Sequence, residues 1–249
     1  MSKTAEKLNK FCKDLALGEM KIVYIYADGT EYAQKPKSYI DAIQEALKFS
    51  EDKVGVKDNT VPNAVKAAHF ATLKHQGQMR KFGNEPYINH CFRVALRLRD
   101  VGEPAISAAL LHDTVEDTPT TYEELEREFG TIIASIVMEL TDPPQSVGNR
   151  ATRKAIVREK LKSASYYAKC VKCADILDNM ESIIEHDKNF AKVFMIEIIL
   201  LLPYLADAED KLYKELVEKV DKYMKETGID VVKIDLPKTS GEGSFQYPY

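Results

Sequence analysis

EPAISAALLHDTVED, residues 103–117, is the stretch that decides the fold, because a nearly continuous apolar run ends in a cluster of ionisable side chains. The stretch predicts a helix that is buried on almost all sides, as is typical of the central helix of a domain. At helical spacing, His112 lies one turn from Glu116, and Asp113 lies one turn from Asp117. Burying these groups together costs free energy unless a cation or a wet cleft compensates. A divalent metal would neutralise them directly.

An isolated His-Asp pair usually lies at a surface or at a helix end. That alternative does not explain a pair embedded in an apolar run, because buried ionisable groups require a partner. One helix cannot surround a metal, so further ligands have to come from other segments. Two segments offer them: PYINH at residues 86–90, and KCADILDNM at residues 172–180, within a helix predicted over residues 165–185. In the second, Asp175, Asn179 and Ser182 form a polar stripe at helical spacing.

The composition is that of a globular protein, with 45% hydrophobic and 30% charged residues among 249. A net charge of −4 excludes a basic nucleic-acid scaffold, so we expect no nucleic-acid partner. The N-terminal stretch lacks the apolar core of a signal peptide. The apolar run at residues 193–205 contains Glu197 and Pro203, which favours a core helix over a membrane span. We therefore expect a cytoplasmic protein without a membrane partner; the oligomeric state stays open.

Cys170 and Cys173 lie three residues apart in a predicted helix. A zinc site is the weaker interpretation, because no second cysteine pair or nearby histidine completes the ligands. Buried apolar thiols are the stronger interpretation, and they suit a reducing compartment.

Turn and capping signals divide the chain into three parts. Residues 1–60 predict an appendage made of a helix, a β-hairpin around Asp28-Gly29 and a second helix. Residues 61–205 predict a helical core domain. Residues 206–249 predict a charged surface helix that ends at Gly228, followed by an irregular tail.

The motifs, taken in order, resemble the hydrolase domain of the RelA/SpoT alarmone enzymes and their stand-alone relatives, the small alarmone hydrolases, within the metal-dependent HD superfamily. The resemblance covers residues 61–205. It rests on HQGQMRK (75–81), PYINH (86–90), LLHDTVEDT (110–118), FG (129–130) and ADILDNM (174–180). It implies an all-α HD-domain bundle, to which the helix–hairpin–helix appendage is added.

The resemblance also implies a ligand set: His90, His112, Asp113 and Asp175 around one divalent ion, typically manganese. Taken alone, His90 is more often a core or capping histidine, and Asp175 a solvated helix charge. The ligand chemistry agrees with the resemblance, because two imidazoles and two carboxylates suit Mn²⁺ or Fe²⁺ better than a structural zinc.

Glu116 and Asp117 correspond to the acidic pair that lies beside the metal in that family. Their expected role is to orient and deprotonate the attacking water, whose pKa a metal would lower. The alternative is a pair of ordinary helix-end charges, since Pro119 shows that the helix stops here.

The substrate residues implied by the resemblance are Arg80, Lys81, Asn179 and Ser182. A guanidinium can stack on a base or fork onto a phosphate, and Asn179 and Ser182 would contact the nucleoside. Without the resemblance, Arg80-Lys81 is equally well explained as a solvated basic turn.

The expected reaction is removal of the 3′-pyrophosphate from a guanosine tetra- or pentaphosphate, which yields GDP or GTP. Ile176 and Glu181 stand where the family usually carries basic residues, which motivates an alternative, a nucleotidase acting on NADPH or a dNTP. A second alternative is a nucleotide-binding regulator without catalysis. The presence of both Glu116 and Asp117 argues against it, because a binding module needs no water-activating pair.

Overall fold

The computed structural model describes residues 22–25, 31–34 and 63–229. Strands β1 (Ile22–Ile25) and β2 (Glu31–Gln34) pair in antiparallel fashion, which confirms the predicted hairpin. The two helices predicted on either side of it lie outside the described residues, and so does the tail from residue 230 onward.

From residue 63 onward the described chain is helical. The elements are α3 (Asn63–Lys74), α4 (Ile88–Arg97), α5 (Glu103–Leu111), α6 (Thr114–Asp117), α7 (Tyr122–Phe129), α8 (Thr131–Leu140), the 3-10 turn η2 (Gln145–Val147), α9 (Arg150–Lys162), α10 (Tyr166–His186), α11 (Lys188–Leu205) and α12 (Asp210–Thr227). This helical bundle confirms the predicted fold class.

The predicted capping signals stand at helix ends. Thr121 precedes α7, and its side chain accepts a hydrogen bond from the Glu124 N–H at 3.3 Å. Gly130, with a φ of 81°, ends α7, and Gly228, in the left-handed region, ends α12. These short-range signals place the helix boundaries to within a few residues.

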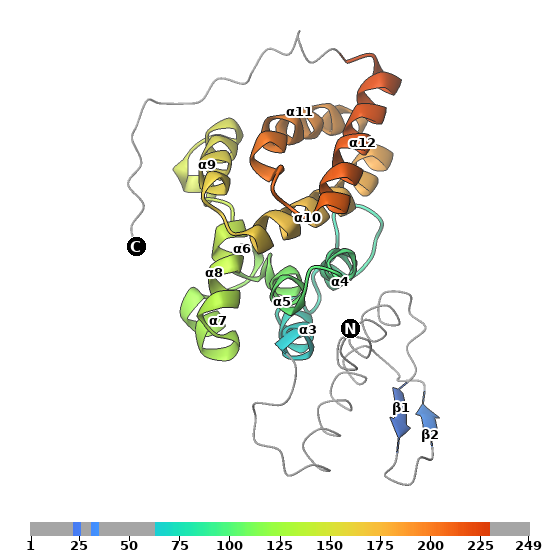
Figure 1. Ribbon diagram of the computed structural model, residues 1–249, viewed down its shortest axis with the longest axis vertical. Coiled ribbons are helices and arrows are strands. Elements are labelled where there is room, and N and C mark those ends of the chain that lie inside the picture. Colours follow the sequence, from blue (N-terminus) through green and yellow to red (C-terminus); the bar gives the residue numbers. More distant parts are fainter. Residues whose placement is uncertain (1–21, 26–30, 35–62, 230–249) are drawn as a thin grey trace.

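The centre of the bundle is α10, which packs against α4, α5, α8, α11 and α12. Figure 1 shows it running between the α11–α12 pair and the α4–α5 pair, with α7 and α8 to one side. Most of its length is buried, including polar residues such as Asp175 and Asp178. A polar side chain on this helix therefore faces other helices rather than solvent.

The prediction of one continuous helix over residues 103–117 is wrong at His112 and Asp113, where a turn separates α5 from α6. Side chains compete for the helix carbonyls here: His112 Nδ1 donates to the Ala109 carbonyl, and Thr114 Oγ1 donates to the Leu111 carbonyl, both at 2.7 Å. The turn separates the two ligand candidates from the acidic pair on α6.

Cys170 and Cys173 are free and buried, as the apolar interpretation predicts. The apolar run at residues 193–205 forms part of α11, whose buried face includes Glu197. Across residues 22–25, 31–34 and 63–229, no helix is long and apolar enough to span a membrane.

Candidate metal centre

Three parts of the chain bring four donor atoms together. His90 comes from the first turn of α4, His112 and Asp113 from the turn between α5 and α6, and Asp175 from the middle of α10. His112 Nε2 lies 3.0 Å from Asp113 Oδ2 and 3.7 Å from Asp175 Oδ1. His90 Nε2 lies 3.7 Å from Asp113 Oδ2 and 3.3 Å from Asp175 Oδ1. The four predicted ligand residues are therefore neighbours in space.

Each imidazole is oriented by a hydrogen bond at Nδ1, while its Nε2 faces the carboxylates. His90 Nδ1 lies 2.7 Å from Asp178 Oδ2, and His112 Nδ1 lies 2.7 Å from the Ala109 carbonyl oxygen. These contacts make Nδ1 the donor, which leaves a lone pair on each Nε2. Both Nε2 atoms are buried and have no hydrogen-bond partner among the described residues. Two unpartnered buried lone pairs directed at the same carboxylates form a donor set that fits a cation.

The spacing of the donors fits a divalent cation. Two ligand atoms that each lie about 2.1 Å from a metal are about 3.0 Å apart at a right angle and about 3.4 Å apart in a tetrahedron. Ligand atoms of His90, His112 and Asp175 all lie within 4.8 Å of one another. The donor set and its spacing therefore suit a divalent metal held by histidine and aspartate.

Each carboxylate has a second polar partner. The Tyr87 hydroxyl donates to Asp113 Oδ2 at 2.6 Å. Asn179 donates to Asp175 Oδ1 at 2.6 Å, while Lys172 Nζ donates to Asp175 Oδ2 at 3.0 Å. These contacts hold the two carboxylates in place before any ligand arrives.

The histidines and aspartates of the centre stabilise one another in their charged forms. Burial by itself would raise the pKa of Asp175, but Lys172 and the two imidazoles hold it well below its usual range. Burial lowers the pKa of His112 and of His90, yet the nearby carboxylates raise both pKa values overall. Protons and a cation therefore compete for the same Nε2 lone pairs.

Sequence reasoning missed Asp178, which lies one turn after Asp175 and is buried. Besides orienting His90, it accepts two hydrogen bonds from Arg93, at 2.7 and 3.1 Å. Arg93 also contacts both carboxylate oxygens of Glu85, at 2.8 and 2.9 Å. The available signal was a second aspartate within the apolar face of the α10 sequence, which demanded a partner.

Glu116 and Asp117 lie on α6, one turn beyond Asp113, and both are exposed to solvent. Glu116 Oε1 accepts a hydrogen bond from the Asp142 N–H at 2.5 Å, and Asp117 Oδ2 accepts one from Gln78 at 2.9 Å. Partial burial, together with the charges of Asp142 and Asp113, raises the pKa of Glu116 to about 7. A carboxylate with such a pKa can exchange a proton near neutral pH. The catalytic role of the pair stays a prediction.

The structure groups three of the four predicted substrate residues. Arg80 Nη2 donates to Asn179 Oδ1 at 2.8 Å and approaches Ser182 Oγ at 3.4 Å. Lys81 points elsewhere: its Nζ lies 4.8 Å from the ring centre of Phe82. Since Asn179 also contacts Asp175, the Arg80 group adjoins the candidate metal centre.

The two positions that depart from the family pattern supply no positive charge. Ile176 is 2% exposed and belongs to the core. Glu181 is exposed, and its carboxylate pairs with Arg97 at 3.2 Å and with Lys219 at 2.7 Å. Any extra cation for a substrate must come from other residues.

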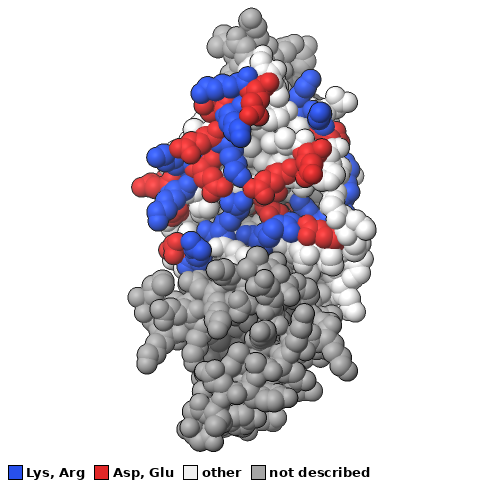
Figure 2. Space-filling model, turned by 90° about the vertical axis from the view of Figure 1, so that its right-hand side faces the viewer, with Lys and Arg blue, Asp and Glu red and all other residues white. Residues whose placement is uncertain are grey.

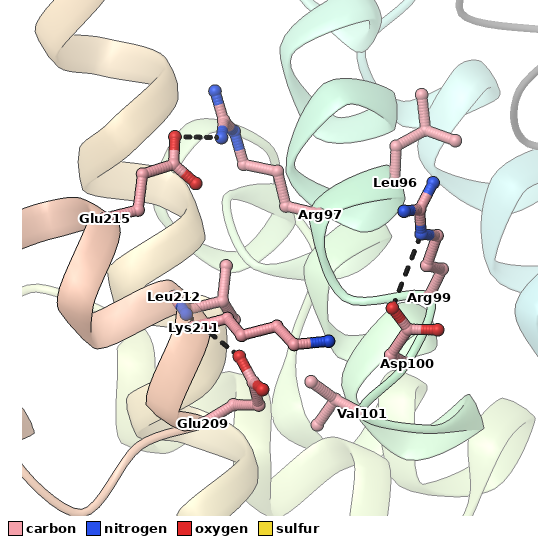
Figure 3. Close-up of a pocket in the computed structure, with 9 residues that line it drawn as sticks. All are labelled: Leu96, Arg97, Arg99, Asp100, Val101, Glu209, Lys211, Leu212 and Glu215. Atoms are coloured by element: carbon pink, nitrogen blue, oxygen red, sulfur yellow. Dashed lines mark hydrogen bonds and ion pairs between the residues drawn. The ribbon is translucent and has the colours of Figure 1, made fainter.

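A surface pocket of about 310 Å³ lies at the far end of α4 from His90, against the start of α12. Figure 3 shows that Arg97, Arg99 and Lys211 share it with acidic side chains, and that Arg97 points toward Glu215. The surrounding face carries both signs of charge in close alternation (Figure 2). None of the predicted site residues lines this pocket.

Comparisons with known proteins point to one family. A family model described as HD domain matches residues 67–195. Over 124 residues the chain is 43% identical to a guanosine-3′,5′-bis(diphosphate) 3′-pyrophosphohydrolase of Xenopus tropicalis, covering 48% of this chain and 68% of that protein. It is 36% identical over 191 residues to an Aquifex aeolicus protein with the same enzyme name, covering 65% of this chain and 26% of that one.

A solved structure agrees with the sequence comparisons. It is described as a metazoan ortholog of SpoT that hydrolyses ppGpp and plays a role in starvation responses. The match has a TM-score of 0.59 at 26% identity and covers 69% of this chain and 99% of that chain.

Proposed function

The chain belongs to the HD domain family, and from that premise we propose that it is a metal-dependent phosphohydrolase that removes the 3′-pyrophosphate of guanosine 3′,5′-bis(diphosphate), leaving GDP, or GTP when the substrate is the pentaphosphate. The observation that carries the proposal is the pair of buried, unpartnered Nε2 atoms of His90 and His112, which meet the carboxylates of Asp113 and Asp175. The names of the two relatives supply the substrate.

His90, His112, Asp113 and Asp175 would hold the metal, and manganese is the ion that we propose. The mixed nitrogen and oxygen set suits Mn²⁺ or Fe²⁺. When bound, such a cation polarises phosphoryl oxygens and makes a coordinated water more acidic.

Glu116 is the proposed general base. Its Oε1 accepts the Asp142 N–H, so Oε2 is the atom that would take a proton from the attacking water. With a pKa of about 7 before a cation adds its positive charge, Glu116 is ionised in a large share of molecules at neutral pH. We assign Asp117, its neighbour on α6, to orienting the same water.

Arg80, Asn179 and Ser182 form the proposed nucleoside and phosphate contact. In the structure the guanidinium is held by the Asn179 and Ser182 oxygens at 2.8 and 3.4 Å, so few of its donors are used. The remaining N–H groups can fork onto a phosphate, or the guanidinium plane can stack on a base. Lys81, on the same turn and exposed, would add a second positive charge.

A different nucleotide remains the second candidate substrate, and one observation favours it. Ile176 is buried and Glu181 is engaged in surface ion pairs, so neither position strengthens binding of a highly charged substrate. A nucleotide with fewer phosphates, such as NADPH or a dNTP, needs fewer cations.

A nucleotide panel tests the proposal. The metal-free protein is reconstituted with Mn²⁺ and incubated separately with ppGpp, pppGpp, NADPH and dGTP, and the products are resolved by ion-exchange chromatography. We expect GDP and pyrophosphate from ppGpp at the highest kcat/KM. Turnover of NADPH or dGTP without turnover of ppGpp would reject the alarmone and retain the hydrolase. No turnover of any member with metal bound would favour a nucleotide-binding regulator.

A further inference from the structure

The loop between α3 and α4, residues 75–87, contacts both ends of α6. The Tyr87 hydroxyl donates to Asp113 Oδ2 at 2.6 Å, and Gln78 Nε2 donates to Asp117 Oδ2 at 2.9 Å. Asp113 precedes α6 and Asp117 ends it, and the Asp117 N–H donates to the Asp113 carbonyl at 2.9 Å. One loop therefore holds a predicted metal ligand and a member of the acidic pair.

The backbone of Gln78 is fixed on both sides before its side chain reaches Asp117. Its N–H donates to the His75 carbonyl at 3.0 Å, and its carbonyl accepts the Tyr87 N–H at 2.9 Å. Gly77, with a φ of 80°, lies in the left-handed region that glycine adopts most readily, and it forms the turn between His75 and Gln78. The Gln78 side chain thus starts from a well-defined position.

The direction of the Gln78 amide follows from its two partners. A carboxylate oxygen only accepts, so the amide nitrogen faces Asp117 and Oε1 faces the other way. There Oε1 lies 2.7 Å from His75 Nδ1. Because an amide oxygen cannot donate, the proton of this contact is on His75 Nδ1. His75, Gln78 and Asp117 therefore form a directed chain of hydrogen bonds.

His75 is held firmly and at some cost. It is 3% exposed, and its ring stacks on that of Tyr87 with the ring centres 5.0 Å apart. Its Nε2 is buried and has no hydrogen-bond partner in the part of the chain that the structure describes. An apolar ring at this place would avoid the cost of that unpartnered atom. The contact of Nδ1 with Gln78, rather than packing, accounts for a histidine here.

We propose that Gln78 is a positioning residue for Asp117, and that His75 fixes the direction of the Gln78 amide. Asp117 is exposed, so without this contact its side chain would be free to change rotamer. The amide occupies Oδ2, which leaves Oδ1 to orient the attacking water. This role deepens the proposed function and rests on it, because the water-orienting role of Asp117 is part of that function.

The same loop offers a matched control. Gln76 has the same side chain two positions earlier and is exposed. Its side chain makes no hydrogen bond to another residue among those that the structure describes. Gln76→Met therefore makes the same chemical change as Gln78→Met without touching the chain of hydrogen bonds.

The direct test is ¹⁵N NMR of the metal-free protein at pH 8, with signals assigned through Gln78→Met, Gln76→Met and His75→Asn. We expect the His75 proton on Nδ1. Asp117→Asn should move the Gln78 amide proton upfield, because a hydrogen bond to a charged acceptor is replaced by a weaker one, while the Gln76 signal stays in place. A His75 ring protonated at Nε2 alone, or a Gln78 signal that does not respond to Asp117→Asn, would overturn the proposal.

Turnover of ppGpp with Mn²⁺ shows whether Gln78 acts through Asp117. Gln78→Met should lower kcat by about 10-fold and leave KM near the parent value, because the proposed nucleotide contacts lie elsewhere. In an Asp117→Ala background the same change should have no further effect, and Gln76→Met should match the parent. Additive losses in the double variant, or a rise in KM in place of a fall in kcat, would contradict the positioning role.

Two variants of His75 separate orientation from packing. His75→Asn keeps an N–H donor close to the place of Nδ1, so it should retain most of the parent kcat. His75→Leu removes the donor and should fall to the level of Gln78→Met. Equal losses in both would show that His75 serves packing alone. If the parent turns over no nucleotide while the NMR signals respond as expected, the proposed function fails and the hold of Gln78 on Asp117 stands.

Discussion

Two ion pairs between α4 and α10 lie one helical turn apart and differ mainly in burial. Arg93 pairs with Asp178, whose side chain is 3% exposed, at 2.7 Å. Arg97 pairs with Glu181, whose side chain is 57% exposed, at 3.2 Å. Each pair joins an arginine of α4 to a carboxylate of α10. The inner pair adjoins the candidate metal centre, and the outer pair borders the surface pocket of Figure 3.

The difference shows what burial adds to an ordinary salt bridge. Asp178 orients His90 because, away from water, the imidazole has no other acceptor of comparable strength. Glu181 shares its carboxylate with Lys219, and solvent can replace either partner at little cost. The inner pair therefore matters for the chemistry, whereas the outer pair contributes to helix contact alone.

The largest expected effect comes from removing a predicted ligand at the inner end. His112→Ala should abolish stoichiometric metal binding and reduce kcat/KM by a factor on the order of 10³ or more, because one of the donors to the cation is lost. The measurements are metal content after dialysis and turnover of the best nucleotide in the panel. The control is Glu215→Gln at the outer end, which should keep full metal content. A His112→Ala protein that retains metal and activity would contradict the ligand assignment.

The next largest effect is expected from a variant that keeps the ligand His90 but disturbs its orientation. Asp178→Asn keeps the size of the side chain but removes the charge that holds His90 Nδ1 and Arg93. Metal affinity should fall by about 10- to 100-fold, as is usual for residues that orient a ligand. Calorimetric titration with Mn²⁺ measures it.

Glu181→Gln is the matched control, since it changes the carboxylate of the outer pair one turn further along α10. It should bind Mn²⁺ with parent affinity. Equal losses in both variants would mean that the two networks do not differ in the way described above.

The fold and part of the site follow from local signals in the sequence. The cap at Thr121 and the glycines at 130 and 228 place helix ends, because each acts within one turn. His112 and Asp113 are also visible from the sequence, because an ionisable pair inside an apolar run demands a partner. The resemblance supplied His90 and Asp175, which periodicity alone could not pair.

Contacts between residues that lie far apart in the sequence could not be predicted from it. His90 and Asp178 are 88 positions apart in the sequence, and neither segment contains a pattern that predicts their contact. The apolar surroundings of Asp178 in the sequence indicate that it needs a partner, but only the packing of α4 on α10 identifies His90 and Arg93 as its partners. The break at His112 is missed because side-chain hydrogen bonds to helix carbonyls, such as the one from His112 to Ala109, have only a weak effect on helix propensity.

A smaller effect appears in the dependence of stability on pH. Burial opposes ionisation of Asp178, but its hydrogen bonds to His90 and Arg93 lower its pKa to about 2. Because this pKa lies below the ordinary value, the contribution to stability is present above the unfolded pKa and is lost as the pH falls toward 2. The loss between pH 6 and pH 3 should be about 1 kcal/mol.

Urea unfolding of the metal-free protein at both pH values measures this loss. Asp178→Asn should lose about 1 kcal/mol less than the parent between pH 6 and pH 3, whereas Glu181→Gln should follow the parent. An identical pH dependence in Asp178→Asn would show that the inner pair contributes no more than a surface pair.

The smallest effect is expected at the outer pair itself. Arg97 donates to Glu215 at 2.9 Å and to Glu181 at 3.2 Å, and both carboxylates remain open to water. Arg97→Met keeps the aliphatic contact and removes the charge, so unfolding free energy should fall by about 0.5 kcal/mol or less, and less still at 1 M NaCl. Urea unfolding at low and high salt measures the change, with turnover unchanged. A larger loss that does not change with salt would mean that the outer network is shielded from solvent. Burial would then no longer distinguish the inner pair from the outer pair.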